Sequence, residues 1–239
     1  MDREGLEVTD APQLDKTERF NPHTGEIYGV VPPGVDVSWN YNVGKAWMAP
    51  DRVFGERIMA LPPRLRRDLL EQIQARAVDG DPAFEQLADQ AVMSAAAGKD
   101  ATGNIRTVGW LQYTVVEQLA VRGAMPGNAA VLVRDRELIP MLKLLDDDFG
   151  LDSNFVRRLP ATLRDSDAVV WDADDAVLQY LTRLNDQQWI DVSIAPSLAD
   201  DATVNALPVV LRSNVILGGR IIADTDLDRD RYQVLQGFL

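Results

Sequence analysis

Apolar side chains recur at helical spacing between residues 50 and 98. Pro50 is a typical helix-start residue, Pro62-Pro63 interrupts the first run, and Asp81-Pro82 is a strong capping pair. The apolar stripes between these boundaries predict three helices, the last of which ends near Gly98. This stretch forms a predicted helical unit that is small for an independent domain.

Beyond residue 100 the pattern changes to short apolar segments separated by turn residues. We expect strands at 105–111, 129–133, 168–171, 176–181, 189–194, 208–211, 214–217 and 220–223, and helices at 113–121 and 136–145. Pro140 is expected to break or bend the second of these helices, and Gly218-Gly219 is predicted to be a two-residue hairpin turn. The order predicts an α+β fold, an antiparallel sheet with helices on one face.

The first 49 residues have a different character. They are rich in Pro, Gly, Asp, Asn and Thr, which predicts an irregular arm with at most one short strand pair at 25–31. The expected division is therefore a docking arm at 1–49, the helical unit at 50–100 and the α+β domain at 101–239. Prolines and glycines in the arm present its large aromatic side chains at fixed places, so its predicted partner-binding residues are Trp39, Tyr41, Asn42 and Trp47.

Charge and composition reduce the number of functional classes to which the chain could belong. The chain has 24 Lys and Arg against 37 Asp and Glu, a net charge of −13, which disfavours nonspecific binding of nucleic acid. It has no cysteine and a single histidine, His23, so neither a thiolate metal site nor a pair of catalytic histidines is expected. Because no apolar run has the length of a membrane span and the N-terminus lacks the pattern of a signal peptide, we expect a soluble intracellular protein with no membrane partner.

The aromatic run also carries a resemblance to a known family. Pro32-Pro33, Gly34, Asp36 and Trp39 precede Tyr41-Asn42-x-Gly44-Lys45-Ala46. This order resembles the region that follows the head-morphogenesis domain of phage Mu F-like minor head proteins, and the resemblance covers residues 3–75. It implies the C-terminal part of a minor head protein, or a free-standing version of it, with phage portal or capsid proteins as partners. The implied location is the host bacterial cytoplasm during assembly and then the virion.

A second resemblance covers the α+β half. The strand and helix order, with Leu159, Pro160, Leu163 and the segment 167–170, looks like the barnase, EndoU, colicin and RelE-like nuclease domains that occur fused to minor head proteins. Those domains cleave RNA through the ribose 2′-hydroxyl. The resemblance implies RNA as the substrate only if the chemistry is retained.

The set of catalytic residues that such chemistry requires is incomplete in this sequence. Cleavage needs a base, an acid and a cation to stabilise the phosphate, and the helix at 136–145 lacks the histidine that related domains often carry there. A nuclease without histidine would have to use Lys143, Arg212, Ser213, Asn214, Arg220 and Tyr232. The ordinary alternative is that Arg212 and Arg220 are solvated residues at the edge of a hairpin.

No metal or other cofactor is predicted. The segment 224–230 alternates carboxylates as an EF-hand loop does, but its sixth position is Arg229 instead of Gly and its twelfth is Leu235 instead of Glu. The favoured interpretation is a structural phage head component. One alternative is a metal-independent, histidine-independent endoribonuclease, and another is an acidic inhibitory module that mimics nucleic acid.

Overall fold

The computed structural model of the chain describes residues 50–76, 82–101, 103–143, 153–204 and 207–239. For residues 50–53, 76, 82–83, 143 and 200–211 the description covers the backbone alone. The three predicted N-terminal helices are present as α1 (Pro50–Ala60), α2 (Pro63–Arg76) and α3 (Pro82–Ala96). Gly98 follows α3 with a φ of 63°, the left-handed conformation that commonly ends a helix.

The rest of the chain mixes helices and strands, with two short helices at Ser153–Arg157 and Leu159–Arg164 and a last strand at Tyr232–Gly237 that were not predicted. The strands are β1 (Ile105–Trp110), β2 (Ala130–Arg134), β3 (Ala168–Asp172), β4 (Val177–Asn185), β5 (Gln188–Val204), β6 (Leu207–Ala223) and β7 (Tyr232–Gly237). The helices are α4 (Tyr113–Val121), α5 (Asp135–Lys143), α6 (Ser153–Arg157) and α7 (Leu159–Arg164), with a short 3-10 turn, η5, at Asp224–Asp226. Pro140 lies inside α5, which continues through it to Lys143.

The strands form one seven-stranded sheet with the order β1-β2-β6-β5-β4-β3-β7. Every pairing is antiparallel except that of β2 with β6, which is parallel. The α+β prediction is confirmed, with one parallel pair in a sheet that was expected to be antiparallel throughout. The parallel pair arises because the chain passes through α5, α6, α7 and three strands between β2 and β6.

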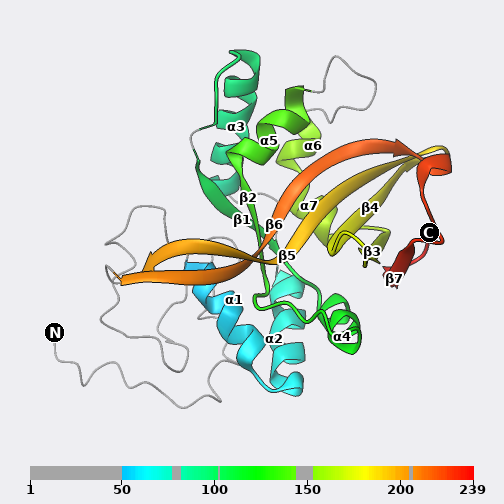
Figure 1. Ribbon diagram of the computed structural model, residues 1–239. Coiled ribbons are helices and arrows are strands. Elements are labelled where there is room, and N and C mark those ends of the chain that lie inside the picture. The colour runs from blue at the N-terminus through cyan, green and yellow to red at the C-terminus, as the bar shows by residue number, and fades with distance from the viewer. Residues whose placement is uncertain (1–49, 77–81, 102, 144–152, 205–206) are drawn as a thin grey trace.

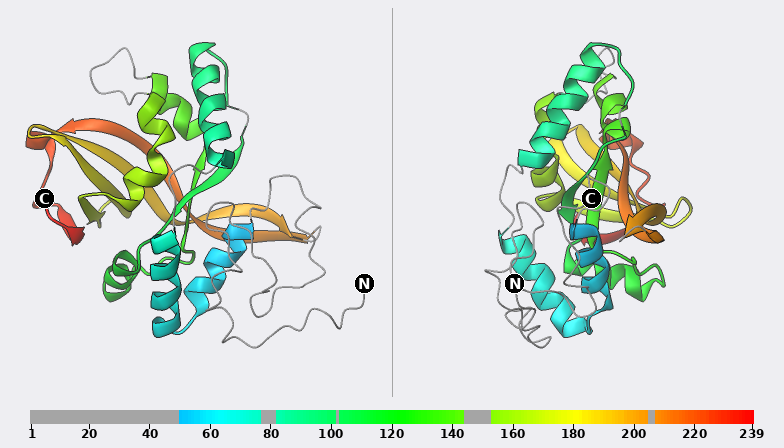
Figure 2. Two further views of the ribbon diagram at one scale, coloured as in Figure 1. Left: turned by 180° about the vertical axis from the view of Figure 1, so that it is seen from behind. Right: turned by 90° about the vertical axis from the view of Figure 1, so that its left-hand side faces the viewer.

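Alternate residues of the central strands enter two apolar clusters on opposite faces of the sheet. The larger cluster contains Val169 of β3 and Val192 of β5, and it also contains Ile58 of α1 and Phe84 of α3. The smaller one, on the other face, gathers around Trp189 and includes Leu227, which follows η5. The helices and the sheet therefore share one core, and Figures 1 and 2 show the helices above and below the crossing point of the long strands.

One predicted turn is wrong. Gly218-Gly219 does not reverse the chain but lies inside β6, where Gly218 pairs with Ser193 and Gly219 with Val192 of β5. The register shifts immediately beside this pair, between Ser193 and Ile194. Glycine inside a strand often marks such an irregularity, because the missing side chain lets the backbone bend, and sequence alone does not separate this use from a turn.

The two longest strands extend well beyond their neighbours in the sheet. The pairing of β4 with β5 ends at Ile194, and the pairing of β2 with β6 is confined to Asn214 and Val215. Residues 198–204 and 207–213 pair only with each other in the described sheet, and we call this two-stranded segment the ribbon. Figure 1 shows it projecting away from the strands β3 and β4, and Figure 2 shows the same projection from behind.

Some of the sequence-based predictions concern residues that the structure does not describe, or are not tested by it. The arm at 1–49, with Trp39, Tyr41, Asn42 and Trp47, lies outside the described residues. The division at residue 100 stays a prediction, although α1 to α3 contribute to the same core as the sheet. Among the described helices, none combines the length and the apolar character that crossing a membrane would require.

Candidate functional site

Several side-chain hydrogen bonds meet at the root of the ribbon, where β5 and β6 leave the sheet. The register of β5 shifts between Ala195 and Leu198, and Ser197 has a φ of 55°, which is uncommon for a residue other than glycine. The Ser197 side chain accepts a hydrogen bond of 2.6 Å from the Gly127 backbone N–H. The strained residue is thus held by the loop that precedes β2.

Asn214 of β6 is fully buried beneath this bend. Its side-chain Nδ2 donates to the backbone oxygens of Asn128 at 2.8 Å and Ala130 at 2.9 Å. Its Oδ1 accepts from the backbone N–H of Ser197 at 3.2 Å. The carboxamide therefore satisfies three backbone groups at once, which is a positioning role for a buried amide.

Asn128 and Glu56 complete the root by bonding to the backbone of Arg212. Asn128 Nδ2 donates to the Arg212 carbonyl at 2.8 Å, and the Arg212 N–H donates to Glu56 Oε1 at 3.0 Å. Asn128 Oδ1 accepts in turn from the backbone N–H of Ala130 at 2.8 Å. Two side chains from distant segments take the place of a neighbouring strand at this point of β6.

Glycines allow these segments to approach closely. A Cβ atom at Gly55 of α1 would lie 1.9 Å from Asn128 Oδ1, and one at Gly127 would lie 2.9 Å from the Arg212 side chain. The Gly55 carbonyl accepts a hydrogen bond of 3.2 Å from the N–H of Ala129. Helix α1 is therefore fastened to the root through its backbone.

Three of the candidate catalytic residues, Arg212, Ser213 and Asn214, come together at this root. Asn214 uses its amide for backbone contacts, and the buried Ser213 Oγ has no hydrogen-bond partner among the described residues. The Arg212 residue is exposed, and its backbone groups are bonded as above.

The other candidates lie elsewhere. Arg220 is eight residues from Arg212 on the same extended strand, about 26 Å at an ordinary strand rise. Tyr232 lies on β7, at the far edge of the sheet from β1, and Lys143 is the last residue of α5. The structure does not place Arg220 near Arg212. The endoribonuclease alternative therefore stays a prediction, and the described basic candidates do not gather at one site.

Arg220 instead faces a buried carboxylate. Its Nε lies 3.6 Å from Asp191 Oδ2, and the Asp191 side chain is only 2% exposed. The second oxygen, Oδ1, is buried and has no hydrogen-bond partner within the described part of the chain. Burial raises the pKa of Asp191 to about 6, against the opposing effect of Arg220.

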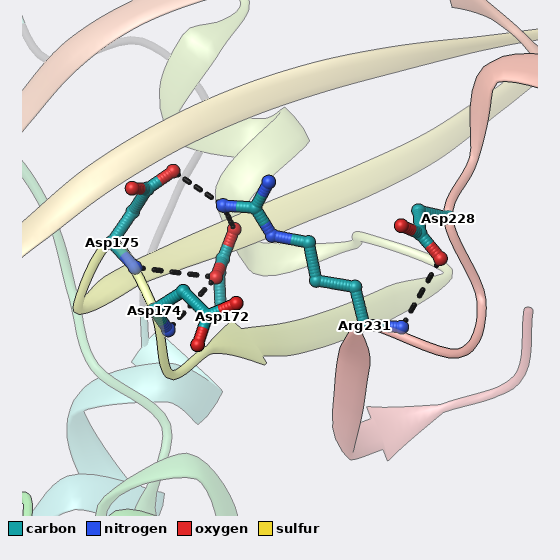
Figure 3. A network of polar contacts seen from close by, with 5 residues as sticks. All are labelled: Asp172, Asp174, Asp175, Asp228 and Arg231. Carbon is teal, nitrogen blue, oxygen red and sulfur yellow. Dashed lines mark hydrogen bonds and ion pairs between the residues drawn. The ribbon is translucent and has the colours of Figure 1, made fainter.

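A separate polar network joins the turn after β3 to the segment before β7 (Figure 3). Arg231 Nη2 contacts both Asp172 Oδ2 and Asp175 Oδ2 at 2.5 Å. Asp172 Oδ1 accepts from the backbone N–H groups of Asp174 and Asp175. Burial of Asp172 opposes its ionisation, yet the hydrogen bond from Arg231 and those from the turn leave its pKa below the ordinary value.

The carboxylates of the EF-hand-like stretch also have internal partners. Asp224 Oδ1 accepts from Trp189 Nε1 at 2.7 Å and from Arg229 Nη2 at 2.9 Å, and Asp228 Oδ1 accepts from the Arg231 N–H. A group of three or more acidic or histidine side chains placed to hold a metal ion is not found among the described residues.

Sequence reasoning missed Asn128, Glu56 and Gly55. The Pro126-Gly127-Asn128 run ahead of an apolar strand is a turn signal, but it does not indicate a partner 84 residues away on β6. Glu56 belongs to a helix that was predicted from its apolar stripe, and that pattern does not indicate partners for its polar residues. Only the packing of α1 against β2 and β6 shows that its carboxylate has a backbone partner.

Comparison with known proteins supports the phage relation. The chain is 27% identical over 175 residues to the "Putative capsid assembly protein F" of Escherichia phage Mu, a match that covers 68% of this chain. It spans 37% of that protein's length. No family model matches the chain, and no solved structure matches it. A relation to phage head proteins, which the aromatic run had indicated, is thus supported by a match over two thirds of the chain.

Proposed function

We propose that this chain takes part in phage head morphogenesis and acts through contacts with portal or capsid subunits. The single observation that carries the proposal is the similarity to the capsid assembly protein of phage Mu. On this proposal the chain works in the host bacterial cytoplasm during assembly and then becomes part of the virion.

The architecture suits a protein that acts by contact. A two-stranded ribbon extends from a shared core, and its root is fastened by buried amides instead of by mobile surface groups. A projection with a rigid base can reach a neighbouring subunit without a large loss of conformational entropy on binding. The same polar residues at the root, Asn128 and Asn214, are occupied in holding the backbone, which leaves them a positioning role.

The arm is the second proposed contact element. Trp39, Tyr41, Asn42 and Trp47 combine apolar area with hydrogen-bonding groups, and tryptophan and tyrosine dominate the energetics of protein interfaces. We propose that these four side chains anchor the arm on a portal or capsid subunit.

Co-expression with the portal and major capsid proteins of the same phage tests the proposal. Affinity capture of this chain should retain at least one of the two proteins, and replacing Trp39, Tyr41 and Trp47 by alanine should reduce the retained amount at least tenfold. Phe238→Ala is the matched control, because Phe238 is an aromatic residue that is 89% exposed outside the arm. Equal capture by wild type and the triple variant would remove the arm from the interface.

An RNA incubation tests the function itself. Purified wild-type protein should leave a defined single-stranded RNA intact, while binding to portal or capsid protein proceeds. Cleavage that disappears in either Arg212→Ala or Lys143→Ala would overturn the proposal in favour of a nuclease.

A further inference from the structure

We infer that the outer edge of β5 in the ribbon binds an extended, positively charged segment of another protein, which adds to the ribbon as a third strand. The inference rests on the proposed function and names the surface and the kind of partner. It follows from the direction of the backbone groups along the ribbon, which the contacts of Arg212 determine.

The backbone contacts of Arg212 determine which residues of the ribbon direct their N–H and carbonyl groups away from the partner strand. Its N–H donates to Glu56 and its carbonyl accepts from Asn128, so both groups face away from β5. Residues directly opposite each other in an antiparallel pair alternate between exchanging both hydrogen bonds and exchanging none. The pair formed by Ala199 and Arg212 is therefore of the second kind, and both of its residues direct their backbone groups outward.

The same alternation continues to the end of the ribbon. The register is unbroken from Leu198 to Val204, so the outward-facing positions of β5 are Ala199, Asp201 and Thr203. Each carries one N–H and one carbonyl group. No described strand pairs with this edge, because the pairing of β4 ends at Ile194. A row of such groups is a template for an added strand.

The opposite edge of the ribbon is less open. The outward positions of β6 are Arg212, Val210 and Pro208. Glu56 and Asn128 already occupy the backbone groups of Arg212, and proline has no N–H to donate. This edge retains the groups of Val210 and one carbonyl, whereas the β5 edge retains three consecutive donor and acceptor pairs.

Charge identifies the occupant of the β5 edge. Asp200 and Asp201 are consecutive residues there, opposite Leu211 and Val210, and the chain as a whole has a net charge of −13. A second copy added around a two-fold axis at Asp201 would bring like charges opposite each other, which destabilises a strand pair. A strand with Lys or Arg near these positions gains instead from opposite charge and from faster association.

A peptide titration tests this site on the full chain. The probe is a short capped peptide that alternates lysine and valine, followed by amide hydrogen exchange. In the free protein the amides of Ala199, Asp201 and Thr203 should exchange faster than those of Asp200 and Ala202, which bond to β6. The peptide should slow the first group at least tenfold and leave the second unchanged.

Two proline variants provide a matched pair for the titration. Asp201→Pro removes an outward donor from the β5 edge, and Val210→Pro removes one from the β6 edge at the directly opposite residue. Neither removes a bond between the two strands. Asp201→Pro should weaken peptide binding at least tenfold and Val210→Pro less than twofold. Asp201→Asn should weaken it severalfold and reduce its salt dependence.

Three results would overturn the inference: equal exchange at odd and even positions of β5, no protection by the peptide, or equal loss of binding in the two proline variants. Failure of the proposed function is separate. If the portal and capsid proteins bind the Asp201→Pro variant as well as wild type, the ribbon edge is not their site, whereas the head role stands. If neither protein binds wild type but the peptide protects Ala199 and Asp201, the edge is a strand-binding site outside that role.

Discussion

At the scale of single residues, Asp191 is the clearest conflict between position and chemistry. It lies in the middle of the sheet, one of its carboxylate oxygens has no hydrogen-bond partner among the described residues, and Arg220, its ion-pair partner, is 63% exposed. Its pKa of about 6 in the folded protein exceeds the ordinary value of 3.8. The folded state therefore binds the proton more tightly than the unfolded chain does, and this acid lowers stability once it is ionised.

Asp191 should make stability fall as the pH rises from about 4 to about 6. The loss is about 1 to 3 kcal/mol in the free energy of unfolding, from a shift of roughly two pKa units discounted for relaxation around the site. Urea unfolding of Asp191→Asn at a series of pH values should show a smaller slope in this interval. Asp174→Asn, at an exposed position in the turn after β3, should keep the wild-type slope. A slope unchanged in Asp191→Asn would contradict the assignment.

Gly55 is a second residue whose environment decides whether a substitution raises or lowers the free energy of unfolding. Alanine is normally favoured over glycine inside a helix by up to about 1 kcal/mol. At Gly55 the added Cβ would meet Asn128 Oδ1 and the Ala130 nitrogen, so Gly55→Ala should lower the free energy of unfolding by about 1 to 3 kcal/mol. Gly218→Ala, where no atom lies within 4 Å of the added Cβ, should change it by less than about 0.5 kcal/mol. Thermal unfolding of both variants measures the difference, and equal effects would refute the close packing of α1.

At the scale of elements, Arg231 joins two strands that are distant in sequence. The turn after β3 and the segment before β7 meet at its guanidinium, and β3 and β7 pair directly beside them (Figure 3). Because the Asp172 carboxylate is buried, removing its counter-charge leaves an ion without compensation.

Arg231→Ala should reduce the free energy of unfolding at pH 7 by roughly 1 to 3 kcal/mol. The pKa of Asp172 is depressed in the folded protein, so its contribution is present above its unfolded pKa and is lost as the pH falls through the lower folded value. Acid titrations of stability should therefore show a weaker dependence below pH 4 in the variant than in wild type. Arg229→Ala, an exposed arginine bonded to Asp224, should have a smaller effect at neutral pH. A larger effect there would contradict the role of Arg231.

The elements that could be predicted are those with a strong local pattern. The helix Tyr113–Val121 was predicted at its observed bounds, because its apolar period is uninterrupted and buried on one side. The length of β5 and β6 could not be predicted, since Pro208, Gly218 and Gly219 are typical of turns and only cross-strand pairing keeps them extended. Polar residues at 212–214 could be singled out, but their partners Asn128 and Glu56 lie 84 to 156 residues away and leave no local signal.

At the scale of the whole molecule, one apolar cluster joins the N-terminal helices to the sheet. Phe84 of α3, Leu70 of α2 and Ile58 of α1 are fully buried together with residues of β1, β2 and β5. A cluster of this kind couples the free energies of its parts, so the helical unit is not expected to unfold separately.

Phe84→Ala should therefore destabilise helices and sheet together. Removing a fully buried phenylalanine costs about 3 to 5 kcal/mol. Far-ultraviolet circular dichroism and tryptophan fluorescence should report one coincident transition in wild type and one shifted transition in the variant. Met93→Ala, at a side chain of α3 that is 64% exposed, is the control and should leave the midpoint nearly unchanged. If circular dichroism and tryptophan fluorescence reported separate transitions, the chain would contain two cooperative units with a boundary near residue 100, and the expectation of one unit would be wrong.

The attachment of α1 to the root of the ribbon has a mechanical consequence. Glu56 lies six residues after Pro50, about 9 Å along the helix axis, so the first 49 residues join the folded body next to the base of the ribbon. Tension on that segment would reach the hydrogen bonds at Arg212 before it reached the centre of the sheet. A pull on the tip of the ribbon would converge on the same few bonds from the other side.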